Sequence, residues 1–283
     1  MLKHLRRSGA RWPGLRGLAV TGALLLFLVL AVIVGPLVWS RDPVQTDLGS
    51  NLQPPSFSHP MGTDGSGRDV LARFLAGAQV SLSAGLVVVI LSGLTGTLLG
   101  LLSGIVRGVT DLALMRVLDV LLAFPQLILA MAVSIGLGPS LNSAVIGIAL
   151  GCVPVYARLV RTEALQIQTQ PYVDAAKTLG LSSARIAVSH IVPGLVPTLL
   201  VQSAAVFGST VVSLSALGFV GLGAQIPTAE WGAMIAEGMS YTLTGGWWVS
   251  FWPGLGLFLV VVAANLLTDG ISHRFTASGA RPW

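Results

Sequence analysis

Six long apolar runs constrain this chain more than any other feature. A helix needs about 20 apolar residues to cross the hydrocarbon core of a bilayer. Only 10% of the 283 residues are charged, against about 25% in a typical soluble protein. The sequence therefore predicts an all-α integral membrane protein with six transmembrane helices. These are expected at roughly 17–39, 80–106, 114–138, 142–161, 194–222 and 250–270.

The first run, 17–39, has one feature of a secretory signal peptide, because basic residues such as Lys3, Arg6 and Arg7 precede it. However, the apolar core of a signal peptide is only about 7–15 residues long. This run is longer, and no small-x-small cleavage site follows it. We therefore expect it to be retained as a transmembrane helix.

The basic residues predict the orientation of the spans. The chain has a net charge of +5, but its Lys and Arg residues lie in short segments beside apolar runs, so nucleic acid is not the expected partner. With the N-terminus inside, 13 of the 16 Lys and Arg residues fall on the inner side, and only Arg41, Arg68 and Arg73 on the outer side. Inner loops of membrane proteins carry such an excess. Both termini are therefore predicted to be cytoplasmic.

The spans divide the chain into a short series of predicted regions. In order, they are a cytoplasmic N-terminal segment (1–16), the first transmembrane helix (17–39), an external loop (40–79), a core with five transmembrane helices (80–271) and a cytoplasmic tail (272–283). The core contains a polar stretch at 163–193, between two of its spans. We call this stretch the insert.

The residues needed for several kinds of catalysis are missing. A P-loop requires Gly-x4-Gly-Lys-Ser/Thr, but Ala176 and Pro171 occupy the glycine positions before Lys177. The four histidines lie outside the spans without metal-ligand spacing, which argues against a metal site and against an intramembrane serine protease. The single Cys152 cannot form an internal disulfide. We therefore expect no enzymatic activity and no bound cofactor, and an energy source on another chain.

The insert has the signals of two short helices. Pro171 suits the first turn of a helix, and Gly180 can adopt the left-handed conformation that closes it. Ser182 or Ser183 can cap the next helix, which Pro193 is expected to stop before the following span.

Each of these helices has a predicted apolar face. The faces consist of Val173, Ala176 and Leu179–Gly180 on the first helix, and of Ile186, Val188 and Ile191 on the second. Ala175 and Ala176 keep the first helix slim, so it can enter a cleft in a partner protein. The alternative is an interfacial helix on the lipid headgroups, but such helices usually carry bulky anchors and many basic residues. The first helix has one lysine, which favours docking.

Glycine recurs every four residues within the second predicted span, at Gly96, Gly100, Gly104 and Gly108. This spacing predicts one smooth helix face, which lets helix backbones approach closely in lipid. Packing within the chain is favoured over a contact with another subunit.

The insert also resembles a known motif. YVDAAKTLG…RIAVSHIVP, residues 172–193, is similar to the EAA loop of bacterial ATP-binding-cassette importer permeases, and Asp174 stands where that family often has Glu. Four further segments resemble dipeptide/oligopeptide/nickel permeases of the C-subunit kind, in the family's order: 59–82, 115–130, 214–238 and 247–270. Gln79 replaces a common Arg and Gly194 a common Asn, and neither departure affects the architecture.

The resemblance implies a type I importer permease fold, in which the EAA loop is a coupling helix that fits a groove on the ATPase subunit. The coupling residues implied here are Tyr172, Asp174, Ala175, Ala176, Lys177, Gly180, Arg185, Ile186 and Pro193. The chain would form half of the translocation path of an ATP-driven importer in the bacterial inner membrane. Dipeptides or oligopeptides are the expected cargo, with nickel or another small solute as the alternative.

The same resemblance implies the partners. They are two ATPase subunits or one fused ATPase, a second homologous permease and an external substrate-binding protein, with ATP and magnesium bound by the ATPase. An ion-coupled secondary transporter is the rival of another class, but such carriers hold ionisable residues at the bilayer midplane. Here Arg116, Asp119, Arg158 and Asp269 all lie near predicted inner ends of spans.

Two groups of outer residues are candidates for docking the binding protein. They are Gly62, Asp64, Arg68 and Asp69 in the external loop, and Glu230 and Trp231 in the last one. The first group lacks the ligand pattern and terminal Glu of a calcium-binding loop. A tight, hydrogen-bonded turn that leads into the next helix is the structural alternative to docking.

Overall fold

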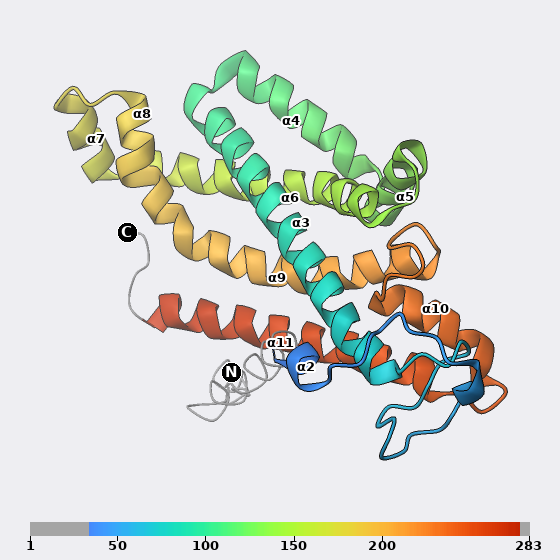
Figure 1. Cartoon of the computed structure of the whole chain (residues 1–283). Helices are drawn as coiled ribbons and strands as arrows, with labels where there is room; N and C mark the ends of the chain where they lie inside the picture. The colour runs from blue at the N-terminus through green and yellow to red at the C-terminus, as the bar shows by residue number, and fades with distance from the viewer. Residues whose placement is uncertain (1–33, 278–283) are drawn as a thin grey trace, which may run out of the picture.

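The computed structural model describes residues 34–277, and these residues are mostly helical (Figure 1). The long helices are α3 (Val70–Val106), α4 (Gly108–Ala123), α5 (Gln126–Leu137), α6 (Leu141–Gln168), α9 (Val192–Phe219), α10 (Trp231–Thr242) and α11 (Trp248–Ala277). The short ones are α2 (Gly35–Val38), η1 (Leu48–Ser50), α7 (Pro171–Thr178), α8 (Ser183–Ile186) and η2 (Ala187–Ile191). The described range contains no β-strand, only an isolated bridge between Thr63 and Asp69. The predicted all-α class is confirmed.

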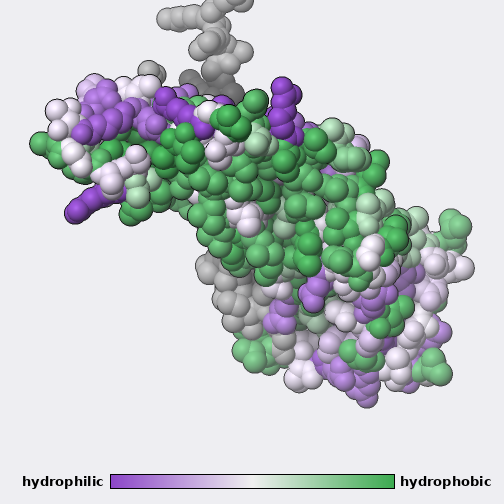
Figure 2. Space-filling view, turned by 90° about the horizontal axis from the view of Figure 1, so that it is seen from above, coloured by the Kyte–Doolittle hydropathy of each residue, from purple (hydrophilic) through white to green (hydrophobic). Residues whose placement is uncertain are grey.

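Four helical segments of the described range are long and apolar enough to cross a membrane. They are α3, α6, the segment Ser183–Phe219 that includes α9, and α11 as far as Ser272; the pair α4–α5 supplies a fifth if it counts as one span. An apolar belt lies between two more hydrophilic ends (Figure 2). The predicted segment 1–16, nearly all of the predicted first span 17–39 and residues 278–283 of the predicted tail lie outside the described residues.

The third predicted span, 114–138, is not one unbroken helix. α4 and α5 meet at an angle of 91° across Phe124 and Pro125. Phe124 is extended, with φ −89° and ψ 133°, because the ring of a following proline disfavours helical backbone. Pro125 also has no N–H to donate to the preceding turn. The expectation of a continuous helix is therefore wrong, for a reason local to these two residues.

The second predicted span begins about ten residues earlier than expected. Asp69 caps α3, because its Oδ1 accepts a hydrogen bond from the N–H of Ala72 at 2.8 Å. A carboxylate satisfies the unpaired N–H groups of a helix start and favours its positive end. The helix therefore starts inside the loop that was expected to extend to residue 79.

The glycine face of α3 packs closely against α6. A Cβ on Gly100 would lie 2.5 Å from the carbonyl oxygen of Ala157 and 2.8 Å from Cβ of Val160, and one on Gly96 would lie 2.5 Å from Cβ of Tyr156. Only glycine allows backbones to approach this closely. Packing within the chain is thus confirmed for Gly96, Gly100 and Gly104. Gly108 does not belong to this face: it starts α4 at φ +67° in open space.

The largest apolar cluster lies where α3, α6 and α9 meet. Tyr156 is fully buried in this cluster, which also includes Val88 of α3 and Leu214 of α9. The Tyr156 hydroxyl donates to Oγ of Ser203 at 3.1 Å, which links α6 to α9. A buried hydroxyl therefore has a partner, as the low-polarity interior requires.

We predict that Gly100→Leu destabilises the α3–α6 contact by about 1–3 kcal/mol, because an overpacked site must move side chains and backbone. Thermal unfolding of the purified complex in detergent measures the loss. Gly136→Leu is the matched control, since Gly136 is helical with nothing within 4 Å of its virtual Cβ. Equal stability of the two variants would contradict the packing role of Gly100.

Candidate functional site

The two hydrophilic ends of the molecule are built differently. The insert, with α7 and α8, projects at one end, and the loops around α10 gather at the other (Figure 1). We call these the insert end and the loop end. All coupling residues expected from the sequence lie at the insert end, and all docking candidates lie at the loop end.

The first helix of the insert ends as predicted. Gly180 has φ +81°, and its N–H donates to the carbonyl of Lys177 at 2.9 Å. The N–H of Leu181 reaches back to the carbonyl of Ala176 at 3.1 Å. These two bonds form a Schellman motif, which satisfies the last carbonyls of a helix and needs a left-handed residue. Gly180 thus fixes a sharp turn between α7 and α8.

The second helix of the insert does not end at Pro193. Ser182 caps α8 through the N–H of Arg185, as expected, at 3.4 Å. The chain then passes through the π-helical turn η2 directly into α9, so that Ser183–Phe219 forms one helical segment. The N–H of Val192 bonds to the carbonyl of Ala187, and Pro193 lies in the first turn of α9. Proline is tolerated there because the wider turn does not require its missing N–H. The expected stop at Pro193 is therefore wrong.

The buried face of the insert packs against its own chain. Val173 and Ala176 of α7 and Ile186 of α8 are buried, and they cluster with Ile191 and with Ile167 of α6. Ala176 therefore does not belong to an outward docking face, in contrast to the expectation for the paired alanines.

Two residues of the predicted apolar faces do not join this buried cluster. Leu179 is 80% exposed and Val188 is 70% exposed. Leu179 follows the last residue of α7, where the Gly180 turn swings it away from the cluster. The π-helical turn contains Val188 and shifts the helical period at that point.

The exposed face of α7 combines apolar and charged groups. Tyr172, Ala175 and Leu179 follow an i, i+3, i+7 spacing on one side of the helix, and all three are exposed. Nζ of Lys177 lies 2.9 Å from Oδ1 of Asp174 beside them. We call these five residues the outer face of α7. Arg185 of α8 is also exposed.

Polar contacts tie the start of the insert to the spans. Arg161 of α6 holds Asp111 of α4 through two hydrogen bonds of 2.6 and 2.7 Å, and the Ser103 hydroxyl also contacts Asp111. Nε2 of Gln168 donates to the carbonyl of Gly104 at 3.0 Å. The end of α6 from which the insert departs is thus fixed to both α3 and α4.

At the loop end, two of the docking candidates, Asp64 and Arg68, are buried in an ion network. Nε of Arg68 lies 2.7 Å from Oδ2 of Asp64, and Nε of Arg73 lies 3.4 Å from the same oxygen. Both arginines also contact Glu237 of α10. Asp64 and Arg68 are buried, as is Gly62, which adopts φ +77°. These residues form the tight turn that was the structural alternative, and they offer no docking surface.

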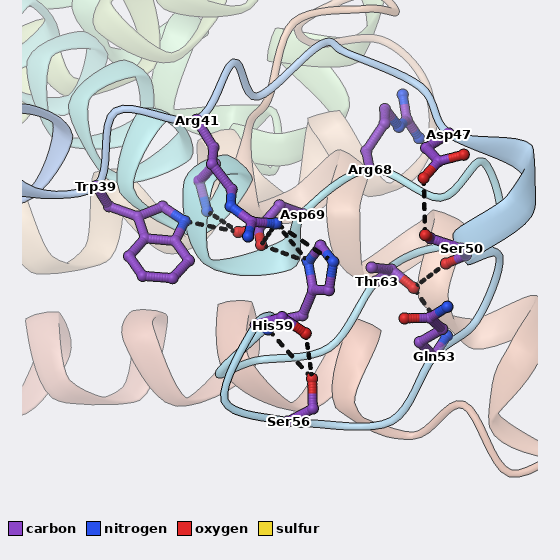
Figure 3. Close-up of polar contacts among 12 residues, drawn as sticks. Trp39, Arg41, Asp47, Ser50, Gln53, Ser56, His59, Thr63, Arg68 and Asp69 are labelled. Atoms are coloured by element: carbon purple, nitrogen blue, oxygen red, sulfur yellow. Dashed lines mark hydrogen bonds and ion pairs between the residues drawn. The ribbon is translucent and has the colours of Figure 1, made fainter.

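Asp69 organises a second group of contacts in the same loop (Figure 3). Its carboxylate accepts from Nε1 of Trp39 at 3.0 Å and lies 2.7 Å from Nδ1 of His59. Nη1 of Arg41 lies 3.6 Å from the same carboxylate. The segment before α3 is thus tied to the start of that helix. Elsewhere in the loop, hydrogen bonds from the Ser50 hydroxyl and the Gly49 N–H lower the pKa of Asp47, which caps η1.

Glu230 and Trp231 are also buried, both at 1% exposure. Glu230 caps α10 by accepting from the N–H groups of Gly232 and Ala233, each at 2.9 Å. Nε1 of Trp231 donates to the carbonyl of Phe74 at 3.0 Å, and the two rings stack at 5.3 Å. The docking role expected for these two residues is therefore not supported. An acidic residue directly before an apolar helix is a capping signal that the sequence contained for both Asp69 and Glu230.

Within residues 34–277, no three His, Cys, Asp or Glu side chains converge to hold a metal ion. A hollow of about 350 Å³ at the insert end is lined by Met115, Asp119, Arg158, Arg161 and Thr162. Arg158 and Asp119 form an ion pair across it, so opposite charges already neutralise each other there.

Comparison with known proteins identifies relatives of the whole chain. The chain is 44% identical over 274 residues to the probable D,D-dipeptide transport system permease protein DdpC of Escherichia coli K12, covering 95% of this chain and 91% of the relative. It is 38% identical over 255 residues to the dipeptide transport system permease protein DppC of Alkalihalophilus pseudofirmus, covering 90% and 84%. It is 39% identical over 258 residues to the glutathione transport system permease protein GsiD of Escherichia coli O6:K15:H31, with the same coverage.

A solved structure and a family model agree with these relatives. An inward-facing structure of the MetNI methionine ABC transporter matches with a TM-score of 0.53 and 18% identity, covering 69% of this chain and 94% of that one. At this identity the likeness concerns the fold alone, and it supports the predicted type I importer permease fold. Residues 96–278 match the model described as binding-protein-dependent transport system inner membrane component. The chain therefore belongs to this family of inner-membrane permeases.

Proposed function

We propose that this chain forms half of the translocation path of an ATP-driven peptide importer, and that the insert couples it to the ATPase subunits. Family membership supports a transport role that depends on a binding protein. The partners would be a second homologous permease, two ATPase subunits or one fused ATPase, and an external substrate-binding protein. ATP and magnesium would be bound by the ATPase.

The observation that carries the coupling role is the outer face of α7. Its exposed Ala175 and Leu179 can enter an apolar groove, and Asp174 and Lys177 flank them with opposite charges. The buried side of the insert is already filled by this chain, so the outer face is the side that a partner can contact. Tyr172, Ala175 and Leu179 lie together on this face beside an ion pair, and an exposed apolar patch rimmed by polar residues is typical of a protein–protein contact.

The continuity of the insert with α9 supports the transmission of movement. The Schellman turn at Gly180 fixes α7 relative to α8, and α8 continues through η2 into α9. A movement imposed on the outer face of α7 would therefore displace a transmembrane helix rather than be absorbed by a flexible loop. The contacts of Gln168 and Arg161 hold the opposite end of the insert on α3 and α4.

The named relatives support peptides as the cargo class. The similar permeases are named for D,D-dipeptide, dipeptide and glutathione transport, and each covers at least 90% of this chain. A peptide cargo is therefore preferred over nickel or another small solute. The distribution of Lys and Arg supports an orientation with the insert and both termini on the cytoplasmic side.

We predict that cysteines at Phe57 and Leu243, both fully exposed at the loop end, react with a membrane-impermeant thiol reagent in intact cells. A cysteine at Thr169, which is exposed beside the insert, should react only in inverted vesicles. Cys152→Ala provides the background, because Cys152 is the single cysteine of the chain. Labelling of Thr169→Cys in intact cells would refute the proposed orientation.

We predict that Leu179→Asp separates the permease from its ATPase without affecting membrane insertion. Burying a leucine side chain is worth about 1.5–3 kcal/mol, so the affinity should fall roughly 10- to 150-fold. Titration of purified ATPase against the permease pair in nanodiscs measures this affinity. Leu243→Asp is the matched control, because Leu243 is also highly exposed but lies at the loop end. If both variants bind the ATPase like the wild type, α7 is an interfacial helix rather than the coupling element.

Gly180→Val tests the rigidity of the turn. A left-handed backbone costs a residue other than glycine about 1–2 kcal/mol, and a β-branched side chain makes it worse. We expect normal insertion but reduced cargo-stimulated ATP hydrolysis and uptake. Gly221→Val is the control, since Gly221 has the same φ of +81° with open space around it, at the loop end. If Gly180→Val and Gly221→Val both kept wild-type cargo-stimulated ATP hydrolysis and uptake, the turn would not transmit movement.

A further inference from the structure

One face of α11 is polar where an apolar face is expected. Asn265, Thr268, Asp269 and Ser272 follow an i, i+3, i+4, i+7 spacing, which places them on one side of the helix. Asn265, Asp269 and Ser272 are exposed on the surface of the chain, and Thr268 is half-buried. This face extends from the interior of the span toward its inner end.

The polar face leads into a hollow between α9 and α11. The hollow has a volume of about 400 Å³. Its lining includes Gly208, Ser209 and Ser213 of α9 and Val261, Ala264 and Asn265 of α11. A Cβ on Gly208 would lie 2.9 Å from Cβ of Ala264, so the two helices approach closely beneath it. Since a water molecule takes about 30 Å³ in the liquid, the hollow has room for roughly a dozen.

The hollow lies at membrane depth. Trp247, Phe251 and Trp252 form an aromatic group at the start of α11, of the kind that sits at the membrane interface. Asn265 lies about 20 Å further along the helix axis than Trp252, at 1.5 Å per residue. The hydrocarbon core is about 30 Å thick, so Asn265 falls within its inner half.

The polar groups there are incompatible with lipid. The Asn265 amide donates to the carbonyl of Val261 at 2.9 Å, and within residues 34–277 nothing donates to its side-chain oxygen. An unsatisfied amide oxygen in hydrocarbon costs several kcal/mol. The outward face of α3 is different, because it carries Leu86, Leu94 and Leu98, all exposed and apolar. The chain thus presents lipid-compatible and water-compatible faces on different helices.

We propose that Ser209, Ser213, Asn265 and Asp269 line the water-filled route by which the cargo crosses the inner half of the membrane. Hydroxyl and amide groups can donate to and accept from the peptide groups of a cargo without holding it by charge. Asp269 then lies toward the inner exit. A close contact with a helix of the partner permease would instead fill the hollow with side chains. The inference rests on the proposed import function, and assigns the route to one face of this chain.

Water access at these positions is the test. In the Cys152→Ala background, single cysteines are placed at Ser213, Asn265 and Asp269, and at Leu94 as the lipid-facing control. The assembled complex in proteoliposomes is treated with a charged methanethiosulfonate reagent. A thiol reacts as its thiolate, and an apolar environment such as lipid raises the pKa of a thiol. Each unit by which the pKa is raised lowers the thiolate fraction tenfold. We therefore expect the three route positions to react at least roughly tenfold faster than Leu94→Cys.

Two results would overturn the assignment. Reaction at Asn265→Cys and Ser213→Cys as slow as at Leu94→Cys would place the face in lipid or protein. Disulfide cross-linking of Asn265→Cys to the partner permease in all nucleotide states would identify a packing interface. Ser213→Cys is nearly isosteric, so it gives an answer even if the Asn265 variant fails to assemble. Labelling does not depend on the cargo. A complex that labels as expected but takes up no dialanine would therefore contradict the proposed peptide cargo, while the assignment of the route would stand.

A functional readout complements the labelling. Asn265→Leu should lower uptake while ATPase binding stays at the wild-type level. Asn265→Gln keeps the carboxamide and should therefore retain uptake. Loss of ATPase binding in Asn265→Leu would indicate a structural role instead.

Discussion

The close contact between α3 and α6 is the constraint on which the rest of this molecule depends. Glycine at positions 96, 100 and 104 brings the two backbones together, and side chains at the end of the contact secure it. Gln168 bonds to the carbonyl of Gly104, and Arg161 holds Asp111 next to Ser103. The insert departs from this fixed end of α6. Its position relative to the spans is therefore set by helix packing that lies outside the insert itself.

The helix that leaves the insert also carries the proposed route. Ser183 and Ser209 belong to one helical segment, about 39 Å apart along its axis at 1.5 Å per residue. The first begins α8 after the turn that closes α7, and the second lines the hollow against α11. A rigid connection between them would let a partner at the insert change the shape of the hollow directly. The π-helical turn at Ala187–Ile191 interrupts the regular α-helix of this connection and accommodates Pro193, and Pro197 lies inside α9 beyond it.

The loop end is stabilised by buried charge. Asp64, Arg68, Arg73 and Glu237 compensate one another, and removal of one partner from such a network leaves an unpaired charge at a cost of about 3–5 kcal/mol. Asp69 and Glu230 add to this by capping α3 and α10. These acidic and basic residues therefore fix loops onto helices. The exposed groups at this end are different ones, including Phe57 and Leu243.

The sequence by itself determined the features that depend on local chemistry or on overall composition. Apolar length predicted membrane helices, the motif order predicted the family, and Gly180 and Ser182 ended and began helices where their backbone and side-chain chemistry required. Tertiary structure alone decided which side of a helix is covered. Periodicity grouped Ala176 with Leu179 on one face. In the structure, Ala176 is buried in the cluster of Val173, Ile167 and Ile186, whereas Leu179 is exposed. Tertiary structure also decided that Asp64 and Glu230 face inward, because their partners Arg73 and Ser215 lie on α3 and α9. A helical repeat specifies which residues share a face, whereas the neighbour that covers this face comes from distant parts of the chain.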